Sequence, residues 1–167
     1  MPDRKTMERA AEDRRRGKSA STQAGEFVRE EFEHIREGKH GARSPKQAIA
    51  IGLSKARRAG VDLRPPKKGA TSEKTRASAE RAYEAGKKGK KTVSRRRSRA
   101  VSSALKRESR ASASTRALSR QGKSAAKRRS PSSRSAAARK SARTKGAAGR
   151  SAAARKAART RARKRRS

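Results

Sequence analysis

The C-terminal third of the chain is unusual in its charge. The last 59 residues, Ser109 to Ser167, contain 21 lysines and arginines and no aspartate or glutamate. Leu118 is the one aliphatic side chain larger than alanine in this segment, which therefore has almost nothing to bury. Ordering a chain costs conformational entropy that buried apolar surface normally offsets. We therefore expect this segment to be disordered, or to become helical on a polyanionic partner.

The rest of the composition agrees with a chain that depends on a partner. It has 52 Lys and Arg against 14 Asp and Glu, a formal net charge of +38, and 2% aromatic residues. Residues 1–64 hold 16 basic and 10 acidic residues, whereas residues 65–167 hold 36 and 4. The two parts therefore carry +6 and +32. This asymmetry is typical of a small folded module with a basic arm that binds nucleic acid.

Several classes of protein are excluded by what the sequence lacks. There is no cysteine, so a disulfide framework or a thiolate metal site is excluded. The longest apolar stretch, residues 48–53, is interrupted by Gly52 and is too short for a signal peptide or a membrane span. We expect no membrane partner and a cytoplasmic location.

An amphipathic helix is predicted from Gln23 to Gly38, where glycine can end it. Its apolar side chains fall on one stripe, the pattern of a helix with one buried face. The members of that stripe are Phe27, Val28, Phe32 and Ile35.

A second helix begins near Ser44, which can cap it, with Pro45 at the first helical position and Gln47 where a capping box needs it. Gly60 is expected to end it. The two helices form a predicted hairpin, residues 21–64, in which the first stripe packs against Ile49, Leu53 and Ala56. So few apolar side chains make a thin core. We expect the hairpin to be marginal alone or to form a homodimer.

The fold class is therefore mainly α, a short helical hairpin with a long disordered or conditionally helical basic tail. A polar N-terminal segment, residues 1–20, precedes the hairpin. A linker with a weak helix (65–91), a basic helical segment (92–120) and an Ala/Lys/Arg/Ser-rich tail (121–167) follow it. The tail contains a duplication, since SAAARKSARTK at 135–145 and SAAARKAARTR at 151–161 share nine of eleven residues.

Catalytic or metal chemistry is not indicated. His34 and His40 are the two histidines of the chain, and Glu30 lies one turn before His34, a spacing that favours surface pairing over metal binding. The carboxylates of Glu26 to Glu37 are expected on an exposed helix, without an apolar cleft, paired with arginines such as Arg29 and Arg36 or with the tail. We expect no enzyme activity, no catalytic residue, no cofactor and no metal.

A phosphate site is one candidate at the start of the second helix. Backbone N–H groups and the helix dipole would meet a phosphate there. A plain helix connection with solvated charges is an equal alternative. The candidate residues are Lys39, Arg43, Ser44 and Lys46.

The basic clusters of the C-terminal half are the main candidate contacts with nucleic acid. Binders of single strands present several aromatic side chains, and this chain has Phe27, Phe32 and Tyr83, of which the first two belong to the predicted core. Contact with the backbone of duplex DNA is therefore favoured. The candidate residues are Arg95, Arg96, Arg97, Arg99, Lys127, Arg128, Arg129, Arg139, Lys140, Arg155, Lys156, Arg163, Lys164, Arg165 and Arg166.

The hairpin resembles a family of small bacterial proteins classed as a domain of unknown function. The shared series are GEFVREE, HIREGKHGARS and KQAIAIGLSKARRAG, within residues 21–63. The resemblance implies no activity, since none is established for that family. The tail from about Ser124 is similar to the Ala/Lys/Arg tails of bacterial linker-histone-like proteins, which implies binding in the nucleoid.

We therefore expect a histone-like, nucleoid-associated protein that binds duplex DNA through phosphates, without sequence specificity, and neutralises or condenses it. An RNA- or ribosome-associated structural protein would use the same arginines. In a third alternative, the hairpin binds a protein partner and the basic tail localises it.

Overall fold

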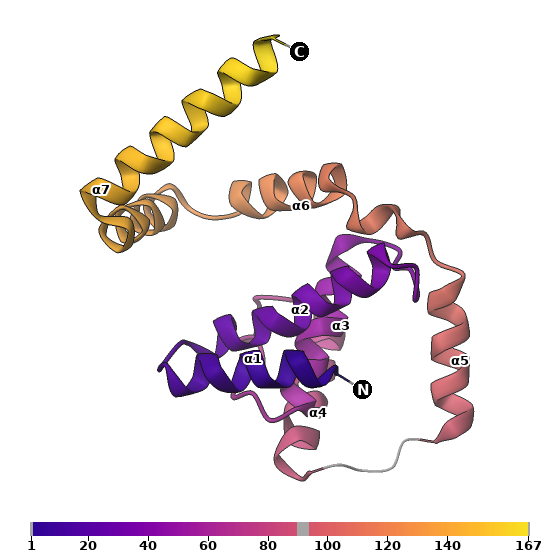
Figure 1. The fold of residues 1–167 in the computed structure, drawn as a ribbon. Coiled ribbons are helices and arrows are strands. Elements are labelled where there is room, and N and C mark those ends of the chain that lie inside the picture. Colours follow the sequence, from indigo (N-terminus) through magenta and orange to yellow (C-terminus); the bar gives the residue numbers. More distant parts are fainter. Residues whose placement is uncertain (1, 90–93, 167) are drawn as a thin grey trace. The chain divides into compact units, whose positions relative to one another are not determined.

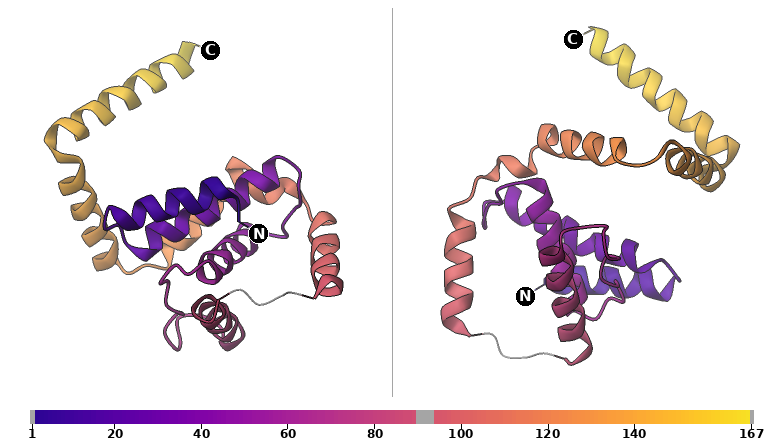
Figure 2. Two further views of the ribbon diagram at one scale, coloured as in Figure 1. Left: turned by 60° about the horizontal axis from the view of Figure 1, so that its bottom comes forward. Right: turned by 180° about the vertical axis from the view of Figure 1, so that it is seen from behind.

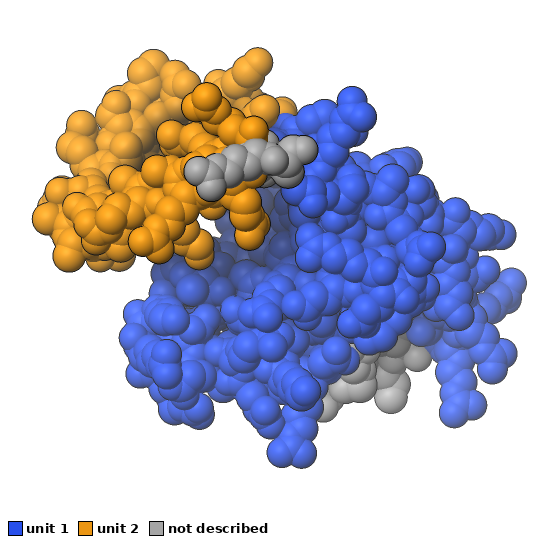
Figure 3. All heavy atoms as spheres, turned by 45° about the horizontal axis from the view of Figure 1, so that its top comes forward, with its two compact units in different colours: residues 1–121 blue, residues 122–167 orange. Residues whose placement is uncertain are grey.

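The computed structural model describes residues 2–89 and 94–166, and within these ranges the chain is helical, without β-strands. It divides into two compact units, residues 1–121 and 122–167 (Figure 3). The mainly α class is confirmed. The helices, labelled in Figure 1, are α1 (Arg4–Arg15), α2 (Ala20–Arg36), α3 (Pro45–Arg58), α4 (Glu73–Lys87), α5 (Arg95–Lys106), the 3-10 helix η1 (Arg110–Ala113), α6 (Thr115–Lys127) and α7 (Pro131–Arg166).

The predicted hairpin is present as α2 and α3, and its core is the expected one. Phe27 packs with Leu53 and Ala56 in one cluster, whereas Phe32 and Ile35 pack with Val28 and Ile49 in a second. Phe27 and Ile35 are fully buried. The stripe of apolar side chains was therefore enough to predict which faces of α2 and α3 meet.

The start of α3 has the predicted cap. The backbone N–H of Gln47 donates to Ser44 Oγ at 3.3 Å, and the side-chain oxygen of Gln47 accepts from the backbone N–H of Arg43 at 2.8 Å. The first bond is that of a capping box, whereas the second reaches Arg43, one residue before the cap, instead of the N–H of Ser44. Between the helices, Gly38 has φ of +79°, which lets the chain leave α2.

The polar N-terminal segment contributes more than its sequence indicates. Residues 4–15 form α1, which lies alongside α2 (Figures 1 and 2). Ala10 of α1 is buried with Phe27, and Arg9 Nε lies 2.7 Å from Glu26 Oε2 of α2. The contact depends on an alanine, which leaves little trace in a hydrophobicity pattern.

The first part of the acid-free segment also belongs to the folded core. The backbone N–H of Ala42 donates to Ser109 O at 3.1 Å, and Arg36 Nε donates to Ala113 O at 3.3 Å. Ala113 is buried in the cluster of Phe32 and Ile35, with Leu118 packed against it. The expected disorder is therefore not supported for this stretch, which is packed on the core.

The expected disorder of the remaining tail is not supported either, because α6 and α7 extend from Thr115 to Arg166 with a short break. Alanine and arginine are among the best helix formers, and like-charge pairs one turn apart cost only about 0.2–0.5 kcal/mol each. Intrinsic propensity thus outweighs the lack of burial.

The duplicated sequence has a structural counterpart in α7. Gly146 has non-helical angles, φ 63° and ψ 177°, and lies between the two copies, so each copy occupies its own helical stretch. Equivalent threonines make equivalent bonds. Thr144 Oγ1 donates to Lys140 O at 2.9 Å, and Thr160 Oγ1 donates to Lys156 O at 3.0 Å.

The closest approach of α2 and α3 can be tested at Gly52. A Cβ there would lie 2.7 Å from Val28 Cα, and the backbone cannot move aside without separating the helices. We expect Gly52→Ala to lower the free energy of unfolding by about 2 kcal/mol, although alanine is the better helix former. The measurement is equilibrium urea unfolding.

The matched control is Gly25→Ala on α2, where an added Cβ meets no atom within 4 Å. That change should be neutral or stabilise by up to about 1 kcal/mol. Equal stability of the two variants would contradict the close packing of α2 on α3.

Candidate nucleic-acid interface

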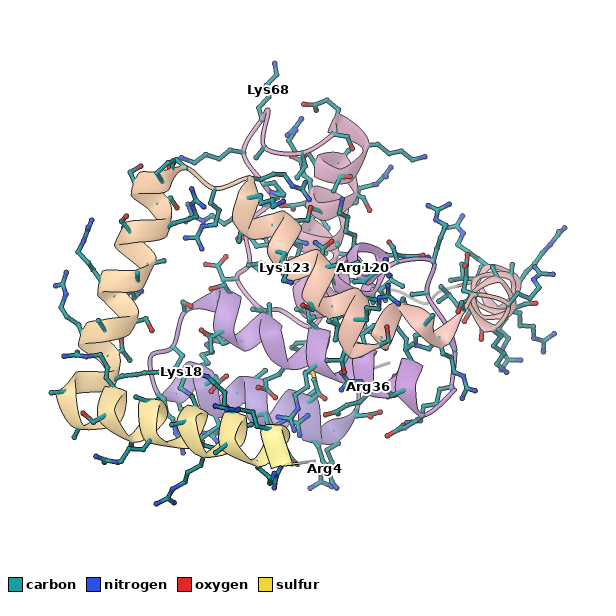
Figure 4. The ribbon with its side chains drawn as sticks, turned by 90° about the horizontal axis from the view of Figure 1, so that it is seen from above. Arg4, Lys18, Arg36, Lys68, Arg120 and Lys123 are labelled. Carbon is teal, nitrogen blue, oxygen red and sulfur yellow. The ribbon has the colours of Figure 1, made fainter. Side chains whose placement is uncertain are left out.

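Helix α5 carries the first group of candidate contacts. None of its residues is buried, and Arg95, Arg96, Arg97 and Arg99 are all exposed. Arg95 and Arg99 are one helical turn apart and Lys106 is two turns further on, so these three lie on one face. Figure 4 shows α5 nearly end-on, with nitrogen-tipped side chains projecting outward. The helix therefore offers a basic face that no part of the core covers.

The second group lies at the end of α6 and in the turn to α7. Lys127, Arg128 and Arg129 are exposed. Two of these side chains make local hydrogen bonds, Arg128 Nη2 to Ser124 Oγ at 3.3 Å and Arg129 Nη2 to Ser133 Oγ at 3.2 Å. Arg120 and Lys123, labelled in Figure 4, precede them on α6. Neutral serines hold the guanidinium groups without cancelling their charge.

The third group is distributed over both halves of α7. Arg139 and Lys140 lie in the first copy of the duplication, and Arg155 and Lys156 occupy the same positions in the second. A further arginine lies four residues after the first one in each copy, at Arg143 and Arg159. The three charges of each copy therefore lie within an arc of about 100° around the helix axis. All these side chains are exposed, as are Arg163 and Arg165, whereas the side chains of Lys164 and Arg166 lie outside the described residues.

Most carboxylates of the protein pair with side chains outside the three groups of basic residues. Thirteen of the fourteen Asp and Glu side chains, all but Glu108, have an ion-pair or hydrogen-bond partner within residues 3–87. The expected pairing of Arg29 is present, since its Nε lies 2.9 Å from Glu33 Oε1. Arg36 instead bonds to the Ala113 carbonyl. The acids of α1, α2 and α4 thus pair with side chains of the same region.

None of the three aromatic side chains is free to stack on a base. Phe27 and Phe32 are buried in the core. The hydroxyl of Tyr83 donates to Asp62 Oδ1 at 2.5 Å, which raises the pKa of Tyr83, and Lys87 Nζ lies 4.5 Å from the centre of its ring. This arrangement disfavours binding of single strands through stacked bases.

In the candidate phosphate site, several backbone N–H groups are already hydrogen-bonded within the protein. The backbone N–H of Gly41 donates to Leu105 O at 2.8 Å, and those of Ala42, Arg43 and Gln47 are bonded as described above. Arg43 and Lys46 are exposed, whereas Ser44 caps α3 and Lys39 Nζ lies 3.0 Å from Glu37 Oε2. A phosphate at this loop would therefore meet the charged side chains of Arg43 and Lys46, not a ring of free backbone N–H groups.

A polar cluster lies beneath the same loop, and sequence reasoning missed it. Glu30 and Glu31 of α2 are each 1% exposed, although the acids of this helix were expected on its surface. Lys55 Nζ of α3 lies 2.6 Å from Glu31 Oε2 and 3.7 Å from Glu30 Oε1. Glu31 is one turn from both Phe27 and Ile35, so it lies on the buried stripe, and this spacing was the available signal.

Both histidines belong to this cluster. His40 Nε2 lies 3.0 Å from Glu31 Oε1, and His34 Nε2 lies 3.9 Å from Glu30 Oε1 and 3.1 Å from Asp3 Oδ2. The hydrogen bond from His34 lowers the pKa of Asp3. The pairing of Glu30 with His34 is thus present, but it is buried instead of lying on the surface. We name these six residues, Asp3, Glu30, Glu31, His34, His40 and Lys55, the polar cluster.

Comparison with known proteins gives one match. Residues 15–68 match the sequence profile of DUF6496, a family of unknown function, which confirms the resemblance of the hairpin over that span. No curated protein and no solved structure matches the chain. Within the described residues, no helix has the length and apolar character that crossing a membrane requires.

The pairing of Lys55 can be tested by its removal. Lys55→Met would leave Glu31 buried without its nearest cation, and removing one partner of a buried pair is strongly destabilising. We expect the free energy of unfolding to fall by about 3 kcal/mol in urea titrations.

Lys46→Met, on the exposed side of the same helix, should change stability by less than about 0.5 kcal/mol. Adding Glu31→Gln to Lys55→Met should recover part of the loss. Equal effects of the two lysine variants would show that the pair does not stabilise the fold.

Proposed function

We propose that the protein binds duplex DNA through phosphate contacts, without sequence specificity, as a non-enzymatic, histone-like protein of the bacterial nucleoid. The observation that carries this proposal is the separation of charge. Helices α5, α6 and α7 expose basic side chains, and the carboxylates that could neutralise them pair within residues 3–87. An unopposed cationic surface binds a polyanion and releases its counterions.

The length and charge of the second half of α7 fit this role. Residues 147–166 number 20 and would span about 30 Å as a helix. Duplex DNA carries about one charge per 1.7 Å, or roughly 18 phosphates over that length. The nine Lys and Arg residues of this stretch could therefore neutralise about half of the phosphate charge beside it.

The side chains that recognise adenine are scarce. Asparagine is absent from the sequence, and glutamine occurs at Gln23, Gln47 and Gln121. The first donates to Lys18 O at 2.8 Å and the second belongs to the cap of α3. Bidentate recognition of adenine depends on these residue types. Binding that differs little between unrelated duplex sequences is the expected result.

The salt dependence of binding tests the phosphate mode. If about a third of the net charge engages at once, some 13 phosphates are neutralised and the slope of log K against log salt is about −11. Replacing all eight basic residues of the two repeats with glutamine should make the slope of log K against log salt less negative by up to about 7. These positions are Arg139, Lys140, Arg143, Lys145, Arg155, Lys156, Arg159 and Arg161.

The matched control exchanges Arg for Lys and Lys for Arg at the same eight positions, which preserves charge and should preserve the slope. A slope no steeper than about −3 for the unaltered protein would refute the proposal, and so would a marked preference for one DNA sequence.

Structured RNA is the alternative partner, since the same arginines would contact its phosphates. Competition between a DNA duplex and a structured RNA at one salt concentration separates the two, and preferential loss of DNA binding would favour RNA. A stoichiometric protein bound to the helical core after nuclease treatment would instead favour the protein-interaction role. A homodimer formed through the hairpin remains a prediction, which analytical ultracentrifugation of the nucleic-acid-free protein tests.

A further inference from the structure

His40 has a fixed orientation in the polar cluster. Its Nδ1 lies 3.0 Å from the backbone oxygen of Gly41. A carbonyl oxygen can only accept a hydrogen bond, so Nδ1 carries a proton. In the neutral imidazole, the proton on one nitrogen leaves a lone pair on the other. Nε2 of neutral His40 is therefore an acceptor.

That acceptor faces another acceptor. His40 Nε2 lies 3.0 Å from Glu31 Oε1, and Glu31 is 1% exposed. Two lone pairs at this separation repel each other unless a positive charge lies between them. A proton would serve, which makes His40 an imidazolium, and so would a metal ion.

The polar cluster also has an excess of negative charge that a bound cation would balance. Asp3, Glu30 and Glu31 contribute three negative charges and Lys55 one positive charge, which leaves an excess of −2 in a chain whose net charge is +38. The nearby Lys39 is paired with Glu37. Glu30 Oε2 is buried without a hydrogen-bond partner. One divalent cation would balance this charge, and so would protons on both histidines.

We propose that the polar cluster is a binding site for a divalent transition-metal ion, of which zinc is the best fit, with Glu31, His34 and His40 as ligands. Ligand atoms of these three residues lie within 4.8 Å of one another, as do those of Asp3, Glu30 and His34. A tetrahedral zinc ion with bonds of about 2.0–2.2 Å holds its ligands roughly 3.3 Å apart. Shifts of about 1 Å or less would close the site.

The surrounding residues have the roles that a zinc site requires. Asp3 Oδ2 is already 3.1 Å from His34 Nε2 and can supply the fourth ligand. Lys55 binds the other oxygen of Glu31, and the Gly41 carbonyl orients His40, as outer-shell partners do. Two imidazoles with carboxylates suit zinc, whereas magnesium and calcium prefer oxygen ligands alone. The ion would join the start of α1, helix α2 and the loop before α3.

Isothermal titration calorimetry with zinc chloride tests the site directly, on the full chain purified without a histidine tag or nucleic acid. The sequence has no cysteine and both of its histidines lie in the polar cluster, so a second site would have carboxylate ligands without imidazole or thiolate. We expect one zinc ion per chain at about pH 7.5. Zinc should also raise the melting temperature, and a chelator should reverse that rise.

Variants identify the ligands. Loss of an outer-shell partner costs about 10–100-fold in affinity, so His34→Gln or His40→Gln should weaken zinc binding by more than about 100-fold. Glu37→Gln, an exposed acid at the end of α2 outside the cluster, should bind zinc like the unaltered protein.

If the histidine variants fail to fold by circular dichroism, the imidazole proton signals of the unaltered protein decide. Both must shift on addition of one equivalent of zinc. A flat titration at pH 7.5, unshifted imidazole signals, or unchanged binding in folded histidine variants would overturn the proposal.

Discussion

The pairing of carboxylates within the helical core is the interaction on which the rest of the structure depends. Arg9 with Glu26, Arg29 with Glu33 and Lys55 with Glu31 join or stabilise the first three helices. Because thirteen of the fourteen acids pair within residues 3–87, few carboxylates remain to neutralise the basic helices that follow. The described basic side chains of α5, α6 and α7 are therefore exposed, in a part of the chain that has few carboxylates.

The core is built largely from small residues, and this sets its geometry. Ala24, Ala42, Ala48, Ala56 and Ala113 are buried among two phenylalanines and one isoleucine. Small side chains let backbones approach closely at Gly52 and still more closely at Gly41, where a Cβ would collide with the carbonyl oxygen of Glu108. Close backbone contact provides packing that large apolar side chains would otherwise supply. The core therefore includes α1, α4 and η1, which pack against the α2–α3 hairpin and add to its buried surface.

The sequence predicted what depends on pattern and missed what depends on context. The α2–α3 interface followed from the spacing of Phe27, Phe32 and Ile35, and the cap of α3 from Ser44 and Gln47. The burial of Ala10 and Ala113 gave no signal, because most alanines of this chain lie on its surface. Glu31 was misplaced because its charge was weighed above its position on the apolar stripe. The tail was expected to be disordered or only conditionally helical, because its lack of burial and its charge repulsion were weighed above the helix propensity of alanine.

The most direct test of the central claim is nuclear magnetic resonance of arginine side-chain Nε–H groups in the full chain during titration with a short DNA duplex. Arginines held by carboxylates, such as Arg9 and Arg29, should keep their shifts, because their charge is already neutralised. Those of α5 and α7, such as Arg99, Arg139 and Arg155, should shift together as phosphates bind. The account is contradicted if the paired arginines of α1 and α2 respond while those of α5 and α7 do not.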